Sequence, residues 1–227
     1  MSQNSMLPIT VVPSLPAVSF SEIESLCKAL EGVAREIQVD IVDGKFVPLV
    51  SWPFTEEDPV TALSQLSQFT DSFSLEMDCM VCNPEQYLDI FVTLGVKRVA
   101  IHVGSTQAYA EIISHAKKHG YRLGFALTND TPLDVVLQYI DEIEYVQLMG
   151  IKEVGQQGQP FDVRTLARAR ELRAQFPELE IAVDGSVNAN TMPQLYAAGV
   201  TRFAPGSAIA KTENPADSYK QLLSLVT

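Results

Sequence analysis

Two apolar runs of the chain carry an aspartate at or near their C-terminal end. Asp40 lies in the β-branched run 37–42, and Asp184 follows the run 181–183 and precedes Gly185. Apolar runs of this kind predict buried strands, and a following glycine predicts where they end. A carboxylate at the end of a buried strand indicates either chemistry or a solvated turn. If it is chemistry, two carboxylates brought together can exchange the roles of acid and base.

The rest of the chain alternates strand patterns with helix patterns, and these elements must position the two aspartates. Apolar runs predict strands over residues 9–12, 36–42, 73–80, 98–103, 121–127, 145–149, 181–183 and 202–204. Helix patterns follow them over residues 21–33, 59–69, 84–94, 106–119, 132–140, 162–176, 190–198 and 215–226. This alternation predicts an α/β fold, a (β/α)₈ TIM barrel that forms a single domain over residues 1–227.

In a barrel of this kind the active site lies at the C-terminal ends of the strands, so polar residues at those ends are candidate site residues. We therefore expect one mouth to gather Ser14, Asp40, Asp78, His102, Met149, Asp184 and the turn at Gly206. The pairs Gly185-Ser186 and Gly206-Ser207 follow the last two strands, where such barrels bind phosphate with loop amides and a short helix N-terminus. The alternative is that these glycines only turn the chain between strand and helix.

The composition limits the classes of partner. The 227 residues are 46% hydrophobic and 19% charged, which suits one globular domain. Sixteen basic against 28 acidic residues give a net charge of −12, which argues against binding to nucleic acid or to an anionic membrane. An anionic substrate must then be held locally, by backbone amides.

The N-terminal residues and the cysteines favour a cytoplasmic protein. Pro8, Pro13 and Pro16 interrupt the first apolar run, and no basic leader precedes it, so we expect neither a signal peptide nor a membrane span. Three cysteines do not make a disulfide framework, so reduced thiols are expected. Cys79 and Cys82 form a lone C-x-x-C that lacks the second ligand pair of a zinc site, and their role stays open.

An ordered series of motifs resembles the ribulose-phosphate 3-epimerase family of phosphosugar epimerases. Residues 40–48, Asp-Ile-Val-Asp-Gly-Lys-Phe-Val-Pro, are similar to the family's D-x-M-D-G-x-F-V-P, and residues 80–85, Met-Val-Cys-Asn-Pro-Glu, to its Met-Val-x-x-Pro-Glu. The other matching pieces stand in the family's order: Pro13-Ser14, Met149, Gly158-Gln159, Val183-Asp184-Gly185 and Gly206-Ser207. The likeness runs from Val12 almost to the end of the chain.

The resemblance implies an enzyme of carbohydrate metabolism that epimerises a ketose phosphate at C3, such as ribulose 5-phosphate. Asp40 and Asp184 match the family's acid and base pair. The residues expected to hold the small phosphorylated sugar are Ser14, Met80, His102, Met149, Gly158, Gln159, Gly185, Ser186, Gly206 and Ser207. We also expect a homo-oligomer.

The sequence departs from the family at the metal site. The resemblance implies a divalent cation held by His, Asp, His and Asp, and the matching positions here are Gln38, Asp40, Asp78 and Asp184. Because both histidines are absent, a nitrogen-rich zinc or iron site is not expected. Three carboxylates and an amide oxygen suit Mg²⁺ or Mn²⁺. Alternatively no metal binds, and Asp78 makes a local hydrogen bond.

Two other functions stay open. One is a non-catalytic phosphosugar-binding barrel that lost its activity with the histidines. The other is a different enolate-forming phosphosugar lyase. Related barrels decarboxylate with an Asp-x-Lys-x-x-Asp motif, and this chain has Asp78-Cys79-Met80 at that place, without the lysine.

Overall fold

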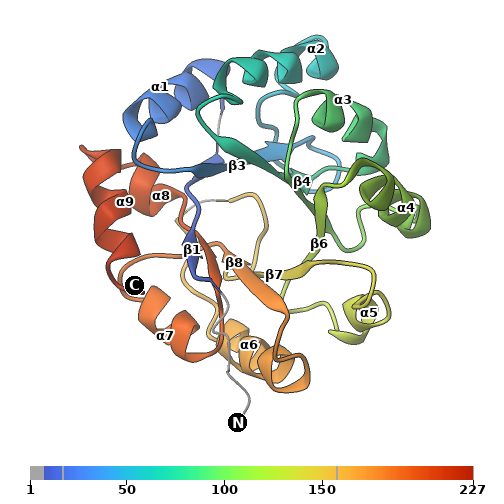
Figure 1. Ribbon diagram of the computed structural model, residues 1–227, viewed down its shortest axis with the longest axis vertical. Helices are drawn as coiled ribbons and strands as arrows, with labels where there is room; N and C mark the ends of the chain where they lie inside the picture. Colours follow the sequence, from blue (N-terminus) through green and yellow to red (C-terminus); the bar gives the residue numbers. More distant parts are fainter. Residues whose placement is uncertain (1–7, 17, 157, 227) are drawn as a thin grey trace.

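Parallel strands and helices alternate along the chain in the computed structural model, which describes residues 8–16, 18–156 and 158–226 (Figure 1). The strands are β1 Thr10–Val11, β2 Ser14–Pro16, β3 Glu36–Val42, β4 Ser74–Met80, β5 Arg98–His102, β6 Arg122–Leu127, β7 Tyr145–Met149, β8 Glu180–Asp184 and β9 Arg202–Ala204. They form one sheet in the order β1-β9-β8-β7-β6-β5-β4-β3-β2, in which every neighbouring pair is parallel. The predicted α/β barrel is confirmed.

The sheet closes because its two outermost strands, β1 and β2, are consecutive in the chain. The Val12 N–H donates to the Phe203 carbonyl at 2.8 Å, and the Gln38 N–H donates to the Pro13 carbonyl at 2.9 Å. One extended segment therefore pairs with β9 through its first half and with β3 through its second half. The predicted strand 9–12 corresponds to β1, but β2 was not predicted. Pro13 lacks an N–H and interrupts the ladder, yet its carbonyl still accepts, and the chain pairs with β3 from Ser14.

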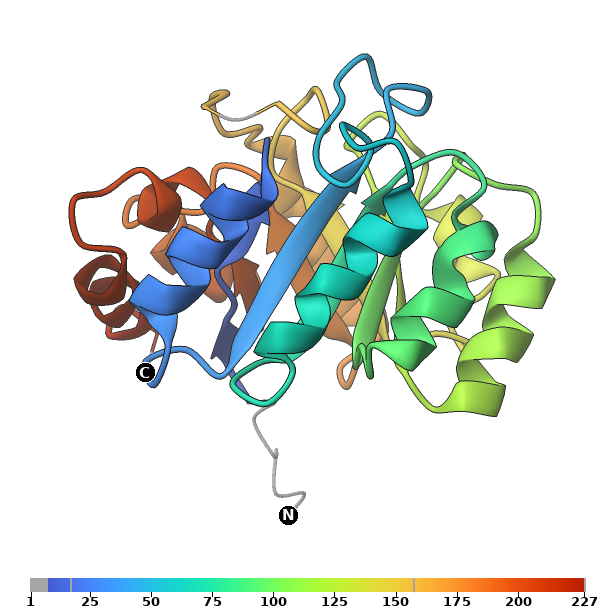
Figure 2. The ribbon, with the colours of Figure 1, turned by 90° about the horizontal axis from the view of Figure 1, so that it is seen from above.

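The helices lie outside the sheet (Figure 2). Their bounds are α1 Phe20–Leu30, α2 Pro59–Ser64, α3 Leu88–Thr93, α4 Tyr109–His119, α5 Asp134–Leu137, α6 Arg164–Gln175, α7 Met192–Ala197, α8 Ser207–Ala210 and α9 Pro215–Leu223. Two predicted helices are part 3₁₀-helix, η1 Gln65–Phe69 and η2 Pro84–Tyr87. Before η2, Asn83 has a φ of +52° and makes no side-chain cap, so the regular α-helix begins only at Leu88.

The side chains of β3 show how the barrel separates its core from its interior. Ile37, Val39 and Ile41 are fully buried in the main hydrophobic core. Gln38 and Asp40 alternate with them and point to the other side of the strand. Each strand thus contributes apolar side chains to the helix layer and can carry polar ones inside the barrel.

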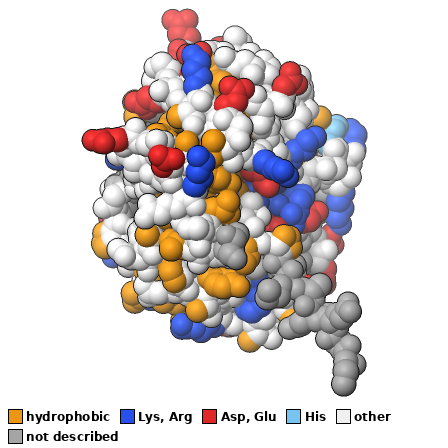
Figure 3. Space-filling view, turned by 60° about the vertical axis from the view of Figure 1, so that its left-hand side comes forward, with side chains coloured by type: hydrophobic (Ala, Val, Ile, Leu, Met, Phe, Trp, Pro, Cys, Tyr) orange, Lys and Arg blue, Asp and Glu red, His pale blue; other side chains and the backbone are white. Residues whose placement is uncertain are grey.

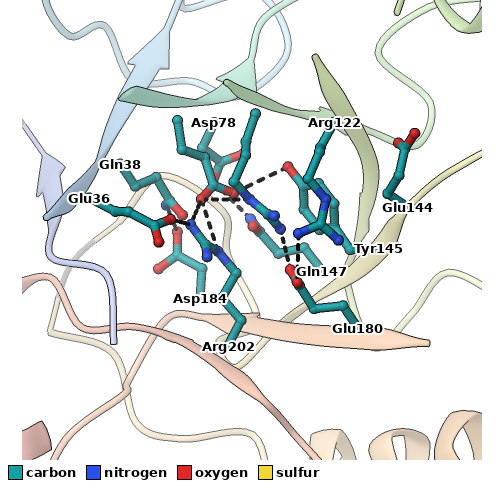
Figure 4. Close-up of polar contacts among 12 residues, drawn as sticks. Glu36, Gln38, Asp78, Arg122, Glu144, Tyr145, Gln147, Glu180, Asp184 and Arg202 are labelled. Carbon is teal, nitrogen blue, oxygen red and sulfur yellow. Dashed lines mark hydrogen bonds and ion pairs between the residues drawn. The ribbon is translucent and has the colours of Figure 1, made fainter. Parts of the chain in front are cut away.

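An ion network fills the barrel near the N-terminal ends of the strands, and part of it is visible in Figure 4. The buried Glu76 carboxylate accepts hydrogen bonds from Arg202 Nε at 3.0 Å and from the Tyr145 hydroxyl at 3.1 Å. Arg98 lies with its Nε 3.4 Å from Glu76, pairs with Glu180, and stacks its guanidinium 4.2 Å from the centre of the Tyr145 ring. These charges compensate one another at the end of the barrel opposite the two aspartates.

The surface carries side chains of both charges. On the face shown in Figure 3, basic and acidic side chains are interspersed, with hydrophobic side chains between them. None of the helices that the structure describes has the length and apolar character needed to cross a bilayer.

Candidate active site

A cavity of about 530 Å³ opens at the C-terminal ends of the strands. The predicted residues on its walls are Ser14, Asp40, Met80, Met149, Gly158, Asp184, Gly185, Ser186, Gly206 and Ser207. The loops that follow β3 and β7 stand above the sheet at this end (Figure 2). The barrel thus brings together residues that are spread over almost the whole sequence.

One amide joins the two predicted aspartates on the cavity floor. Gln38 Nε2 donates to Asp40 Oδ1 at 3.0 Å and to Asp184 Oδ2 at 2.8 Å, although Gln38 and Asp184 are 146 positions apart. The Ser14 hydroxyl donates to the other Asp40 oxygen, Oδ2, at 2.7 Å. Asp40 and Asp184 are each 8% exposed, which leaves both carboxyl groups accessible only from the cavity.

Asp78 lies beside this pair, and two buried side chains hold its carboxylate in place. His102 Nε2 lies 2.9 Å from Asp78 Oδ1, and Gln147 Nε2 donates to Asp78 Oδ2 at 3.0 Å. The group is seen in Figure 4, where Gln38, Asp78, Gln147 and Asp184 lie close together. His102 does not line the cavity: it is buried and packs against the Phe46 ring, with ring centres 5.6 Å apart. It therefore positions Asp78.

Burial and mutual repulsion raise the pKa values of the two cavity carboxyls. Loss of solvation, aided by the charge of Asp78, raises the pKa of Asp40 to about 7, against the opposing hydrogen bonds from Gln38 and Ser14. Burial also raises the pKa of Asp184 well above its usual range, and the charges of Asp40 and Asp78 add to this. At neutral pH the cluster retains protons, so one carboxyl can act as an acid while the other acts as a base.

The same cluster has the donor set for a hard cation. Single carboxylate oxygens of Asp40, Asp78 and Asp184 all lie within 4.8 Å of one another. Oxygen ligands suit Mg²⁺ or Mn²⁺, and a cation there would replace the protons that the carboxyls otherwise retain. Gln38 presents its amide nitrogen to two of these carboxylates, so its side chain would have to turn over to offer the oxygen. The three aspartates fit a cation, and Gln38 as placed is a hydrogen-bond donor.

Backbone amides form the second half of the site. Among the described residues, the N–H groups of Gly185, Ser186, Gly206 and Ser207 donate no hydrogen bond, and all four residues line the cavity. Ser186 has a φ of +53°, in the left-handed region where glycine is usual. Unpaired N–H groups beside a cavity are suited to bind an anion.

The loop after β7 closes one side of the cavity. Gly155, Gln156 and Gly158 line it. Gln159 does not: its amide bonds within the loop, accepting from the Glu153 N–H at 3.1 Å and donating to the Gln156 carbonyl at 3.1 Å. The Gln159 carbonyl accepts a hydrogen bond from the Ser186 hydroxyl. Gln159 thus ties the loop to the turn after β8 and does not reach the cavity.

Apolar side chains form the remaining wall. Val42, Met80, Met149, Ile151 and Val154 make a separate small cluster of buried residues. The first four also line the cavity. A mixed wall of this kind suits a ligand with both carbon and polar surfaces.

The site includes residues that were not predicted, and Gln147 and Lys211 are two of them. Gln147 lies in the apolar run 145–149, two positions before Met149 and therefore on the same face of the strand. A polar residue at that position was a signal for a role inside the barrel. Lys211 lines the cavity after α8, and the sequence carries no comparable signal for it.

The cysteines take no part in the site. Cys79 is buried in the outer core and Cys82 is partly buried, and both are free thiols. The Cys82 N–H donates to Asp43 Oδ2 at 2.9 Å, while Asp43 Oδ1 accepts from the N–H groups of Lys45 and Phe46. Asp43 therefore fixes the turn after β3.

Replacing Asp40 by asparagine is expected to stabilise the fold in a pH-dependent way. Because the pKa of Asp40 is about 7 in the folded state against an ordinary 3.8, the folded protein binds this proton more tightly than the unfolded chain. The wild type then loses stability as pH rises from about 4 to 7, and the variant does not. The gain in unfolding free energy should approach about 4 kcal/mol above pH 7 and vanish near pH 4.

Urea denaturation between pH 4 and 8.5, in buffer with a chelator, measures this difference. Asp71→Asn, at an exposed position, is the matched control and should show no such trend. A gain from Asp40→Asn that does not change with pH would mean that the folded protein does not hold the Asp40 proton.

Comparison with known proteins agrees with the motifs. A profile of the ribulose-phosphate 3 epimerase family matches residues 10–210. The ribulose-phosphate 3-epimerase of Schizosaccharomyces pombe is 28% identical over 224 residues, which cover 97% of this chain and 95% of that one. The ribulose-phosphate 3-epimerase of Bacillus subtilis is 30% identical over 210 residues, covering 88% of this chain and 92% of that one.

A solved structure agrees with the fold. The 3-hexulose-6-phosphate synthase from Salmonella typhimurium superposes with a TM-score of 0.72 at 14% identity, covering 96% of this chain and 98% of that one. At this identity the likeness concerns the barrel itself.

Proposed function

The chain belongs to the ribulose-phosphate 3-epimerase family, and on this premise we propose that it epimerises a ketose phosphate at C3, with Asp40 and Asp184 as the proton-transfer pair. One observation carries the proposal. Two buried carboxyls from β3 and β8 share the Gln38 amide on the floor of a cavity whose rim offers unpaired amide N–H groups. This arrangement supports acid and base chemistry beside an anion site.

The reaction needs a base on one face of the substrate carbon and an acid on the other. One carboxylate removes the C3 proton, and the electrons of the C–H bond move toward the C2 carbonyl to give an enediolate. The other carboxyl, which carries a proton because of its raised pKa, returns a proton to the opposite face of C3. The two residues then have exchanged protonation states, so the same pair serves both directions.

Neighbouring groups hold the proton-transfer pair in place, and a bound cation would stabilise the charge that develops on the substrate oxygens. The Ser14 hydroxyl and the Gln38 amide lie beside the pair and hold its carboxylates in place. Asp40, Asp78 and Asp184 would hold a divalent cation, Mg²⁺ or Mn²⁺ by their oxygen donors, and such a cation supplies Lewis-acid stabilisation of an enediolate. His102 and Gln147 keep Asp78 turned toward the pair.

The phosphate of the substrate is assigned to the amides of Gly185, Ser186, Gly206 and Ser207. Their N–H groups are unpaired in the described chain, and all four residues line the cavity. The loop that carries Gly158 covers the substrate from the side of β7. The cytoplasmic location and the homo-oligomeric state stay predictions.

An isotope experiment tests the proposal directly. The purified protein, with a chelator or with added Mg²⁺, Mn²⁺ or Zn²⁺, is incubated with ribulose 5-phosphate in D₂O and followed by NMR. We expect the C3 epimer to appear with deuterium at C3, and Mg²⁺ or Mn²⁺ to serve better than Zn²⁺. A substrate-induced rise in melting temperature without epimerisation or exchange under any condition would favour the non-catalytic phosphosugar-binding barrel instead.

A further inference from the structure

The cavity is short of positive charge. Its walls carry the carboxyl groups of Asp40, Asp184 and Glu22, in a chain whose net charge is −12. Lys211 is the one basic residue among the described residues that line it. A phosphate monoester carries close to two negative charges at neutral pH, and backbone amides offer it dipoles but no net charge. A cationic side chain beside the amides would add the net positive charge that they lack.

Lys211 lies on the same turn as two of the amide donors. It directly follows α8, and its own N–H donates to the Ser207 carbonyl at 3.2 Å. The turn is anchored, because the N–H groups of Ile209 and Ala210 both donate to the Gly206 carbonyl at 2.9 Å and the Ile209 side chain is fully buried. The backbone thus fixes the root of the Lys211 side chain beside Gly206 and Ser207.

The Lys211 ammonium has no competing partner. In the described part of the chain it makes neither a hydrogen bond nor an ion pair, whereas Lys220 on the next helix lies 3.7 Å from Asp217. A flexible stem with a compact charge can reach a phosphate oxygen without a fixed geometry. Lys211 is therefore positioned and available to bind an anion in the cavity.

We propose that Lys211 is a specificity-determining residue that contacts the substrate phosphate and selects phosphorylated ketoses over unphosphorylated ones. The inference rests on the proposed function for the identity of the sugar, and on the cavity alone for the binding of phosphate. The amides orient the phosphate, and Lys211 offsets the repulsion from the nearby carboxylates. Charge-assisted hydrogen bonds of this kind change affinity by about 10- to 100-fold.

Binding of inorganic phosphate tests the inference without any turnover. Isothermal titration calorimetry on the full chain compares wild type, Lys211→Met and Lys211→Arg. The control Lys118→Met removes the same charge from an exposed position of α4 outside the cavity. We expect Lys211→Met to bind phosphate about 10- to 100-fold more weakly, and the arginine and Lys118 variants to stay within about threefold of wild type.

The outcomes separate this inference from the proposed function. Unchanged phosphate binding in Lys211→Met, or an equal loss in Lys118→Met, would overturn the role of Lys211. A selective loss in Lys211→Met supports it even if no ketose phosphate is turned over. If the enzyme is active, Lys211→Met should also raise KM for the ketose phosphate about tenfold or more, with kcat within about threefold, and leave kcat/KM for the unphosphorylated ketose unchanged.

Discussion

Replacing Asp184 by asparagine is expected to lower kcat for C3 epimerisation of a ketose phosphate by about 10³-fold or more. Asparagine preserves the size of the side chain and can still accept the hydrogen bond from Gln38, but it neither takes up nor delivers a proton. Proton transfer by a positioned side chain contributes about 10²- to 10⁴-fold to an enzymatic rate. Asp40→Asn should cost a similar factor, because each residue works on one face of C3.

Isotope exchange distinguishes a two-carboxylate mechanism from a general loss of the site. With one carboxylate left, Asp184→Asn should still exchange the C3 hydrogen of one epimer with solvent, and Asp40→Asn that of the other epimer. Neither variant should invert the carbon at a useful rate. Phosphate binding measured by calorimetry is the control, since the amide donors are unchanged. Retention of kcat within about tenfold in either variant would contradict the assignment.

Replacing Glu76 by glutamine is expected to reduce the free energy of unfolding by about 3–5 kcal/mol. The Glu76 carboxylate is 1% exposed and is the shared partner of Arg202 and Arg98 inside the barrel. Glutamine fits the space, but it leaves two buried guanidinium groups with less opposing charge. Breaking a buried ion pair by removing one partner costs this much because a buried charge remains uncompensated.

A surface pair provides the matched control for this prediction. Glu24 lies 3.3 Å from Lys28 on α1, with side chains 40% and 70% exposed, so Glu24→Gln should change stability by less than about 0.5 kcal/mol. Urea denaturation followed by circular dichroism measures both variants. A loss below about 1 kcal/mol for Glu76→Gln would show that the arginines find other compensation. If the variant is recovered only unfolded, Glu76→Asp, which keeps the charge, should be recovered folded.

Local pattern predicted most of the architecture. The alternation of apolar runs with helical stripes identified the barrel, and the positions of Asp40 and Asp184 at strand ends placed both at its mouth. The ends of elements were predicted less well. Residues 14–16 form the unpredicted strand β2 because β3 offers a partner. Asn83 adopts a left-handed conformation just before the predicted helix 84–94, whose regular α-helical part begins only at Leu88. Both outcomes depend on neighbours that are distant in the sequence.

The sequence also predicted the positions of some site residues correctly and those of others incorrectly. Ser14, Met80 and the glycine turns lie where they were expected. His102 was expected in the pocket, but it is buried behind the cavity wall and contacts Asp78. Gln159 was also expected there, but its side-chain amide makes hydrogen bonds within its own loop. Position along a strand shows that a side chain faces the interior of a barrel. Position along a strand does not show how deep in the barrel that side chain lies or which residues it contacts.

The sequence by itself determined that this chain folds as a parallel (β/α)₈ barrel with two aspartates and two glycine turns at one end, because strand periodicity and strand ends are local properties. Only the tertiary structure decided what joins those aspartates. Closure of the barrel through the segment 10–16 brings β3 and β8 within reach of one Gln38 amide, and the burial that results raises the pKa values of both carboxyls. Desolvation and charge proximity depend on packing across the whole chain, so no local pattern contains them.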